Sequence, residues 1–271
     1  MRKKVETMMK TVHFVPGYFL DPVHRISVIL VGAGGNGSQM LSSLARMDHA
    51  LRQLRHPGLA VRVYDPDVVE APNVGRQLFT AGDLGRNKAE CLVSRFNRMY
   101  GTDWEAEPEA YRCKCTANVI ITCVDSVKCR KEVGAFLSRV RRNQSKSGRT
   151  LNEHSWFYWL DLGNGQRTGQ AILGSACIPQ PDSSEYRAVE TLPLMTEQFD
   201  LSRVRDADSG PSCSLAEALT KQDLFINSAL SQISASLLWS VLTDAAIDAR
   251  GFFLNLDTYR VSPMPLISAE L

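Results

Sequence analysis

The stretch from residue 65 to residue 88 concentrates side chains that could act on phosphate groups. Arginine and lysine donate hydrogen bonds to oxygens on which negative charge builds during phosphoryl or nucleotidyl transfer. A dehydrogenase needs little more than one acid here, because it binds its cofactor without acting on the phosphates. The stretch therefore favours chemistry on a nucleotide over hydride transfer. Its candidate side chains are Asp65, Asp67, Asn73, Arg76, Gln77 and Lys88.

A glycine-rich turn precedes this stretch. Residues 26–31 form an apolar run typical of a buried strand, which leads into Gly-Ala-Gly-Gly-Asn-Gly and then into a helix with one apolar face. Gly32 permits a tight turn, Gly34 allows backbone to approach a phosphate, and Gly37 lets the helix pack on the strand. The N–H groups at the start of that helix favour an anion. Strand, glycines and helix in this order predict a Rossmann-like nucleotide-binding unit.

Acidic residues follow two further strands. Asp65 closes the strand predicted at 59–65 and matches the acid that holds a ribose hydroxyl in such folds. It lies further from the glycines than the usual distance of about 20 residues, and we interpret the polar segment 48–56 as a longer connection. Asp125 follows the strand predicted at 119–124. Since carboxylates are the usual ligands of hard cations, Asp125 is a candidate magnesium ligand.

The rest of the pattern predicts an α/β fold: a Rossmann-like, doubly wound, mostly parallel sheet with a mixed-sheet extension towards the C-terminus. Further strands are expected at 104–107, 156–162, 169–173 and 252–256, and helices at 85–100, at 127–140 and, with a break, at 214–242. Irregular segments are expected at 1–25 (an N-terminal arm), 141–150 (a surface loop) and 177–213 (a long mobile crossover loop).

Composition narrows the possible partners and compartments. The chain has 271 residues, 44% of them hydrophobic, and a formal net charge of +2, so no general attraction to nucleic acid or membranes is expected. Neither a signal peptide nor a bilayer-spanning segment is predicted. The seven cysteines are an odd number, typical of free thiols in a reducing compartment. We therefore expect a cytoplasmic protein.

At these positions the sequence resembles the ThiF/MoeB/HesA family, the bacterial relatives of ubiquitin-activating enzymes. The family pattern is GxGxxG, an acid-x-Asp after the second strand, Asn-x-x-Arg-Gln, a lysine at the next helix start and an aspartate after a later strand. The match is good over about residues 25–140 and looser beyond. The segment PSCSLAEALTKQDLFINSAL, residues 211–230, resembles the ThiF-related protein of PRTRC cassettes more closely still.

The resemblance implies adenylylation. ATP and magnesium would activate the C-terminal carboxylate of a small ubiquitin-like protein, in a homodimer. Residues 26–271 would be one adenylation domain, with a nucleotide-binding half at 26–140 and an acceptor-binding and dimerisation half at 150–271. By the same resemblance, Gly32, Gly34 and Gly37 would contact the phosphates, and Asp65, with Asp67 beside it, would contact the ribose. Asn73, Arg76, Gln77 and Lys88 would contact the triphosphate, and Asp125 would bind magnesium. Of these residues, Arg76, Lys88 and Asp125 would be catalytic.

Some family members also form a thioester on a cysteine of the crossover loop. Cys213 is the candidate, because it precedes a predicted helix N-terminus that would lower its pKa. The alternative is an ordinary loop thiol, and Cys177 is the second candidate. Some members also insert an arginine from the partner's N-terminal arm into the ATP site. Arg2 or Arg25 could fill that role, which the sequence does not assign.

Other residues carry less specific signals. Many relatives bind zinc through two Cys-x-x-Cys pairs, whereas Cys113 and Cys115 have the wrong spacing, so no zinc is expected. The aromatic run 156–159 indicates core or a dimer interface. An NAD-linked oxidoreductase and a non-catalytic binding module of the same fold are the alternatives to an activating enzyme. Structural or surface roles are expected for His13, His24, His49, His56 and His154, and packed positions for Cys91, Cys123 and Cys129.

Overall fold

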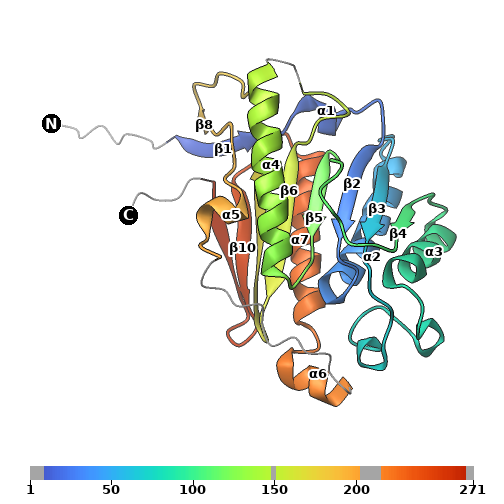
Figure 1. The fold of residues 1–271 in the computed structure, drawn as a ribbon. Helices are drawn as coiled ribbons and strands as arrows, with labels where there is room; N and C mark the ends of the chain where they lie inside the picture. The colour runs from blue at the N-terminus through green and yellow to red at the C-terminus, as the bar shows by residue number, and fades with distance from the viewer. Residues whose placement is uncertain (1–8, 148–150, 202–214, 267–271) are drawn as a thin grey trace.

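The central feature of the fold is an eight-stranded sheet, seen in a computed structural model that describes residues 9–147, 151–201 and 215–266. The strand order is β11-β10-β7-β6-β5-β2-β3-β4 (Figure 1). The parallel strands are β2 (Ile26–Val31), β3 (Leu59–Tyr64), β4 (Glu105–Glu107), β5 (Val119–Thr122) and β6 (Tyr158–Asn164). The antiparallel strands are β7 (Thr168–Ser175), β10 (Ala249–Asn255) and β11 (Arg260–Pro265). The predicted fold class, a mostly parallel sheet with a mixed extension, is therefore confirmed.

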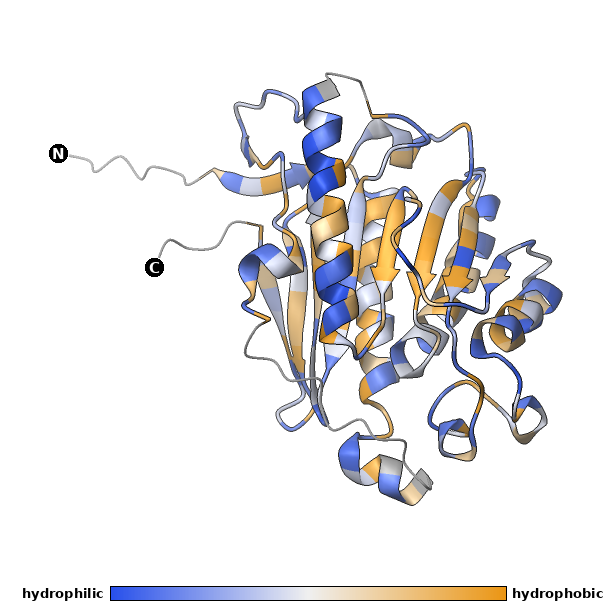
Figure 2. Cartoon of the chain, in the orientation of Figure 1, coloured by the Kyte–Doolittle hydropathy of each residue, from blue (hydrophilic) through white to orange (hydrophobic). Residues whose placement is uncertain are grey.

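Helices cover both faces of this sheet. One face carries α2 (Gly35–Gln53), α3 (Lys88–Tyr100) and α7 (Ile226–Thr243), and the other carries α4 (Val127–Ser147) and α5 (Met195–Gln198) (Figure 1). The strands between the two helix layers are mostly apolar, whereas the helices turn hydrophilic residues outward (Figure 2). This pattern is that of a parallel sheet buried on both faces. Among the described residues, no helix combines the length and apolar character that crossing a membrane requires.

Small elements complete the fold. A second sheet has the order β8-β1-β9 and is built from β1 (Lys10–Phe14), β8 (Tyr186–Ala188) and β9 (Ala246–Ile247). The short helices are α1 (Gly17–Leu20), η1 (Ala71–Asn73), η2 (Ala81–Asp83) and α6 (Leu215–Lys221). The break expected in the C-terminal helix is the segment between α6 and α7.

The N-terminal segment is not an irregular arm where the structure describes it. Residues 10–14 form β1, and Phe19 of α1 is fully buried against the rings of Phe157 and Tyr158. The prediction was wrong because one short strand carries no periodic signal of its own. Its partners β8 and β9 lie about 170 and 230 residues further along the chain.

Residues 48–53 and 141–147, which we expected to lie in a connection and in a surface loop, are the last turns of α2 and α4. Asp48, in α2, is buried; its carboxylate accepts a hydrogen bond from the Leu59 N–H at 2.7 Å and pairs with Arg52. Arg141, in α4, pairs with Glu197 at 3.0 Å. Polar residues extend these helices because tertiary partners satisfy their charges.

The described part of the crossover segment 177–213 is not a loop throughout. It contains β8 and α5, and the described part ends at residue 201. The aromatic run 156–159 lies in the core, since each of its four side chains is at most 1% exposed. Of the two interpretations of that run, core and dimer interface, the structure supports the core.

His13 links the small sheet to the core, and its burial should make the free energy of unfolding depend on pH. It is fully buried: its Nδ1 lies 2.6 Å from the Val189 carbonyl oxygen and its Nε2 lies 3.0 Å from the Tyr158 hydroxyl. Burial lowers the pKa of His13 from its ordinary value near 6.5. The unfolded chain therefore binds a proton more readily than the folded one below about pH 6.5.

We expect the free energy of unfolding to fall as the pH drops below about 6.5, by at most about 1.4 kcal/mol per pH unit for this one group. Urea titrations between pH 7 and pH 5 measure it. Replacing His13 with glutamine should flatten the slope, whereas the same change at exposed His154 should leave it unchanged. Equal slopes in wild type and the His13→Gln variant would contradict this prediction.

Candidate nucleotide-binding site

The glycine turn lies at the carboxyl end of β2, and packing explains why two of its residues are glycines. Gly32 has a φ of +91°, and an added Cβ would lie 2.7 Å from the Cys123 carbonyl oxygen. A Cβ on Gly37 would lie only 1.8 Å from the Gly32 carbonyl oxygen. A Cβ on Gly34 would come no closer than 3.9 Å to Gln77. Gly34 therefore leaves open space at the start of α2, where backbone N–H groups favour an anion.

Asp65 fixes this turn to the end of β3. Its carboxylate accepts hydrogen bonds from the Ala33 N–H at 2.6 Å and the Asp67 N–H at 2.8 Å, and its side chain is buried. Burial raises the pKa of Asp65, and the two N–H donors oppose that rise because they stabilise the charged form. Both oxygens of the acid that we expected to face a ribose are thus already engaged within the protein.

Asp67 and Lys88 form an ion pair beside the turn. The Lys88 Nζ lies 3.0 Å from Asp67 Oδ2; the Lys88 side chain is 10% exposed and that of Asp67 is 64% exposed. The pair is held by Asn87, which caps α3 and donates its amide hydrogens to the carbonyl oxygens of Asp65 and Asp67. A nearly buried ammonium therefore faces the site with one open carboxylate next to it.

The Asn-x-x-Arg-Gln run forms the opposite side of the site. Asn73 is structural, since its side-chain oxygen accepts from the Glu70 N–H at 2.9 Å and completes a cap of η1. Arg76 donates from Nη1 to the side-chain oxygen of Gln222, and its buried Nε has no hydrogen-bond partner among the described residues. Burial lowers the pKa of Arg76. Gln77 lies near Gly34, and its buried Oε1 also lacks a partner.

Asp125 follows β5, the strand between β2 and β6. Its side chain is exposed and makes no hydrogen bond or ion pair within the described part of the chain. A buried pair lies beneath it, in which Arg130 Nε donates to Asp161 Oδ1 at 3.1 Å, and Thr122 donates to the same oxygen. This pair ties α4 to β6, so Asp125 is an open carboxylate on a firmly held loop.

The structure adds polar residues that we did not predict. Asn36 donates to Asn164 Oδ1 at 2.8 Å, across the carboxyl ends of β2 and β6. The side chain of Asn227 lies against Gly35, where an added Cβ would be 2.5 Å from its amide nitrogen. Gln222 and Asn227 belong to the QDLFIN part of the segment 211–230, whose motif was the only sequence signal for them.

The remaining candidates do not join this group of residues. Cys213 and Arg2 lie outside the described residues. Cys177 is near Glu190, with its sulfur 3.8 Å from Oε2. Arg25 pairs with Asp103 at the start of β2, the opposite edge of the sheet. No cluster of three or more His, Cys, Asp or Glu residues able to hold a metal occurs in the described ranges.

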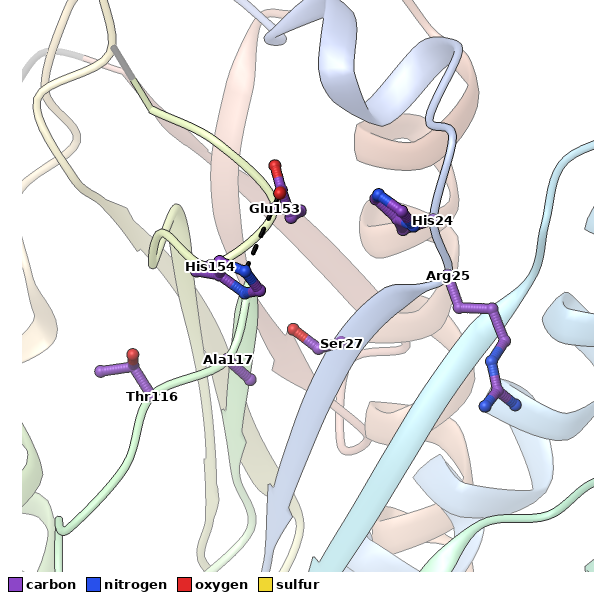
Figure 3. A pocket seen from close by; sticks show the side chains of 7 residues that line it. All are labelled: His24, Arg25, Ser27, Thr116, Ala117, Glu153 and His154. Carbon is purple, nitrogen blue, oxygen red and sulfur yellow. Dashed lines mark ion pairs between the residues drawn. The ribbon is translucent and has the colours of Figure 1, made fainter. Parts of the chain in front are cut away.

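A cavity also lies at that opposite edge. It has a volume of about 610 Å³, and Figure 3 shows Glu153 and His154 on one side, His24 on the other and Ser27 between them. The Arg25 side chain points away from it (Figure 3). None of the glycines or strand-end acids lines this cavity. We therefore locate the candidate nucleotide site from the residues at the strand ends, which is where ligands bind in doubly wound sheets.

Comparison with known proteins relates part of this chain to a described family. Residues 8–141 match the family model described as ThiF family. The ubiquitin-activating enzyme E1 1 of Schizosaccharomyces pombe is 38% identical over 82 residues, which are 30% of this chain and 8% of that enzyme. The NEDD8-activating enzyme E1 catalytic subunit of Arabidopsis thaliana is 32% identical over 132 residues, which are 44% of this chain and 26% of that subunit. The chain thus spans about a quarter or less of each relative.

Solved structures share the fold. The crystal structure of PaaA aligns with a TM-score of 0.56 over 90% of this chain and 65% of that chain, at 14% identity. E. coli MccB crystallised with ATP aligns with a TM-score of 0.54 over 91% of this chain and 65% of that chain, at 11% identity. Residues 8–141 therefore carry a ThiF-family match, and the relatives support a ThiF/MoeB-like family for this chain.

Proposed function

We propose that this protein binds ATP with magnesium and adenylylates the C-terminal carboxylate of a small ubiquitin-like protein. The observation that supports the proposal is that the glycine turn, Asp67 with its partner Lys88, and Asp125 follow the neighbouring strands β2, β3 and β5, and that Arg76 lies on the segment between β3 and α3. The two cations can neutralise phosphate oxygens, and the exposed carboxylate has no partner of its own in the described residues.

The described residues fit a triphosphate. Arg76 has no carboxylate partner there, and its buried Nε lacks an acceptor, which a phosphate oxygen would supply. Gly34 leaves room for backbone to approach an anion. Magnesium usually takes one or two protein carboxylates and completes its shell with phosphates and water, so Asp125 alone is a sufficient protein ligand. Magnesium would supply charge neutralisation on the phosphates.

In this reaction a carboxylate oxygen of the substrate attacks the α-phosphorus. The bond to the bridging oxygen breaks, and pyrophosphate leaves with the electron pair, which gives an acyl-adenylate. Arg76 and Lys88 would hold the phosphates and stabilise the charge that develops on their oxygens. Asp67 is the carboxylate open to a ribose hydroxyl, while Asp65 would order the turn. Asn73 and Gln77 would shape the wall beside the phosphates.

Finer features belong to the same proposal. The activating enzymes in the comparison are named for ubiquitin and NEDD8, so the substrate would be a ubiquitin-like protein. Residues 26–140 would bind the nucleotide, and residues 150–271 would bind the acceptor and form the interface of a homodimer. The chain would be of the ThiF-related type found in PRTRC cassettes. A later thioester on Cys213 would require transfer from the adenylate.

Thermal unfolding tests nucleotide binding without a partner. A ligand at 100 times its Kd should add about 2.7 kcal/mol of stability. We expect ATP with magnesium to raise the midpoint and NAD to leave it unchanged. Lys88→Ala should remove most of the ATP effect because it deletes a phosphate contact. Lys128→Ala, at an 82% exposed position in α4, is the matched control and should retain the effect.

Each other outcome points elsewhere. Stabilisation by NAD alone would indicate an oxidoreductase. No response to either ligand would indicate a binding module that has lost nucleotide binding, and would overturn the proposal.

A further inference from the structure

The segment that joins α6 to α7 contacts the candidate site. Gln222, the first residue after α6, accepts hydrogen bonds at Oε1 from Arg76 and from Asn227 Nδ2, the latter at 3.0 Å. One amide oxygen therefore connects the arginine of the Asn-x-x-Arg-Gln run to the first turn of α7. This contact joins residues that are 146 positions apart in the chain.

Gln222 is itself held in place from both sides. Asn227 is only 2% exposed and lies against Gly35 at the start of α2. On the other side, Asp223 donates from its N–H to the Gln166 carbonyl oxygen at 3.0 Å and pairs with Arg167 at 2.6 Å. The acceptor for Arg76 is therefore fixed to α7 and to the turn between β6 and β7.

The chemistry of this acceptor matters for the charge of Arg76. Arg130 and Arg167 each pair with a carboxylate, which compensates their charge. Gln222 instead offers a neutral amide, so it orients the guanidinium without cancelling the charge. The contact occupies Nη1, and within the described ranges Nε has no partner. Nε and Nη2 form the edge of a guanidinium that binds two oxygens of one oxyanion.

We propose that Gln222, held by Asn227, is a positioning residue that orients Arg76 for a phosphate group of the bound nucleotide. The inference rests on the proposed function, because it assumes that Arg76 receives a phosphate. A free arginine side chain loses much rotamer freedom when it binds, and Gln222 removes part of that cost before the nucleotide arrives. The opposite role, in which Gln222 blocks Arg76 until a nucleotide displaces it, predicts the opposite effect of removing Gln222.

Calorimetric titration with ATP and magnesium distinguishes these cases. Gln222→Ala should weaken ATP binding about tenfold, because the cost of immobilising the Arg76 side chain is then paid when ATP binds. The matched control is Gln232→Ala, because Gln232 also accepts a hydrogen bond from an arginine, Arg46, at 3.3 Å, but between α2 and α7 and away from the site. The control should bind ATP as wild type does, and both variants are titrated at a temperature at which each is fully folded.

A second titration separates positioning from a general change in the site. The second titration uses adenosine, which carries no phosphate. Gln222→Ala should therefore bind adenosine with the same Kd as wild type. If wild type binds ATP, three results for Gln222→Ala would each overturn the inference. They are an equal loss of affinity for adenosine and ATP, an unchanged affinity for ATP, and a higher affinity for ATP. If wild type itself does not bind ATP, the proposed function fails, and the inference fails with it.

Discussion

Asparagine in place of Asp125 should abolish the magnesium dependence of ATP binding while the fold stays intact. The amide keeps the size of the side chain but removes the negative charge that a hard cation requires. With a small ubiquitin-like protein as the carboxylate substrate, ATP–pyrophosphate exchange should fall by about 100-fold or more, because charge stabilisation by a metal is worth several kcal/mol. Titrations with ATP in magnesium and in EDTA measure the first effect directly.

The structure explains why this change should spare the fold. Asp125 is exposed and has no hydrogen bond or ion pair in the described part of the chain, so its replacement should alter the free energy of unfolding by no more than about 0.5 kcal/mol. The control is Asp182→Asn. Asp182 is also an exposed aspartate, but it is not one of the candidate-site residues at the strand ends, so the variant should keep the magnesium dependence. A magnesium dependence that survives in Asp125→Asn would show that another group binds the metal.

The sequence predicted those site residues whose positions follow from local patterns of strands, turns and helix starts. The glycine turn, Asp67, Lys88 and Asp125 each follow a strand or begin a helix, and parallel neighbouring strands bring such positions to one edge. Asp65 shows the limit of this reasoning. Its position at the end of β3 was predicted, but only the fold reveals that its two oxygens bind N–H groups of neighbouring loops.

Contacts between distant segments could not be predicted. Gln222 meets Arg76 across 146 residues, and His13 meets Val189 across 176 residues. A polar residue in a single sequence gives no sign of which distant group will satisfy it. The same cause applies to the end of α4, where the charge of Arg141 is satisfied by Glu197, which is 56 residues away in the chain.

Alanine at Gly37 should produce the largest loss of stability. Its Cβ would lie 1.8 Å from the Gly32 carbonyl oxygen and 2.7 Å from the Gly32 carbonyl carbon. Both are backbone atoms of a turn that is itself pressed against Cys123, so the contact cannot be relieved by turning a flexible side chain. We expect the free energy of unfolding to fall by about 3 kcal/mol or more, the upper range for overpacking. Urea unfolding measures it as a lower midpoint with an unchanged slope.

Gly17→Ala is the matched control, because Gly17 also begins a helix but has no atom within 4 Å of an added Cβ. Alanine there should be neutral or slightly stabilising, since it restricts the unfolded chain without a clash. Equal stability of Gly37→Ala and Gly17→Ala would mean that α2 can move away from the turn at little cost. Because α2 supplies the N–H groups beside Gly34, the turn would then be too loosely held to order an anion, and the nucleotide site would have to be assigned elsewhere.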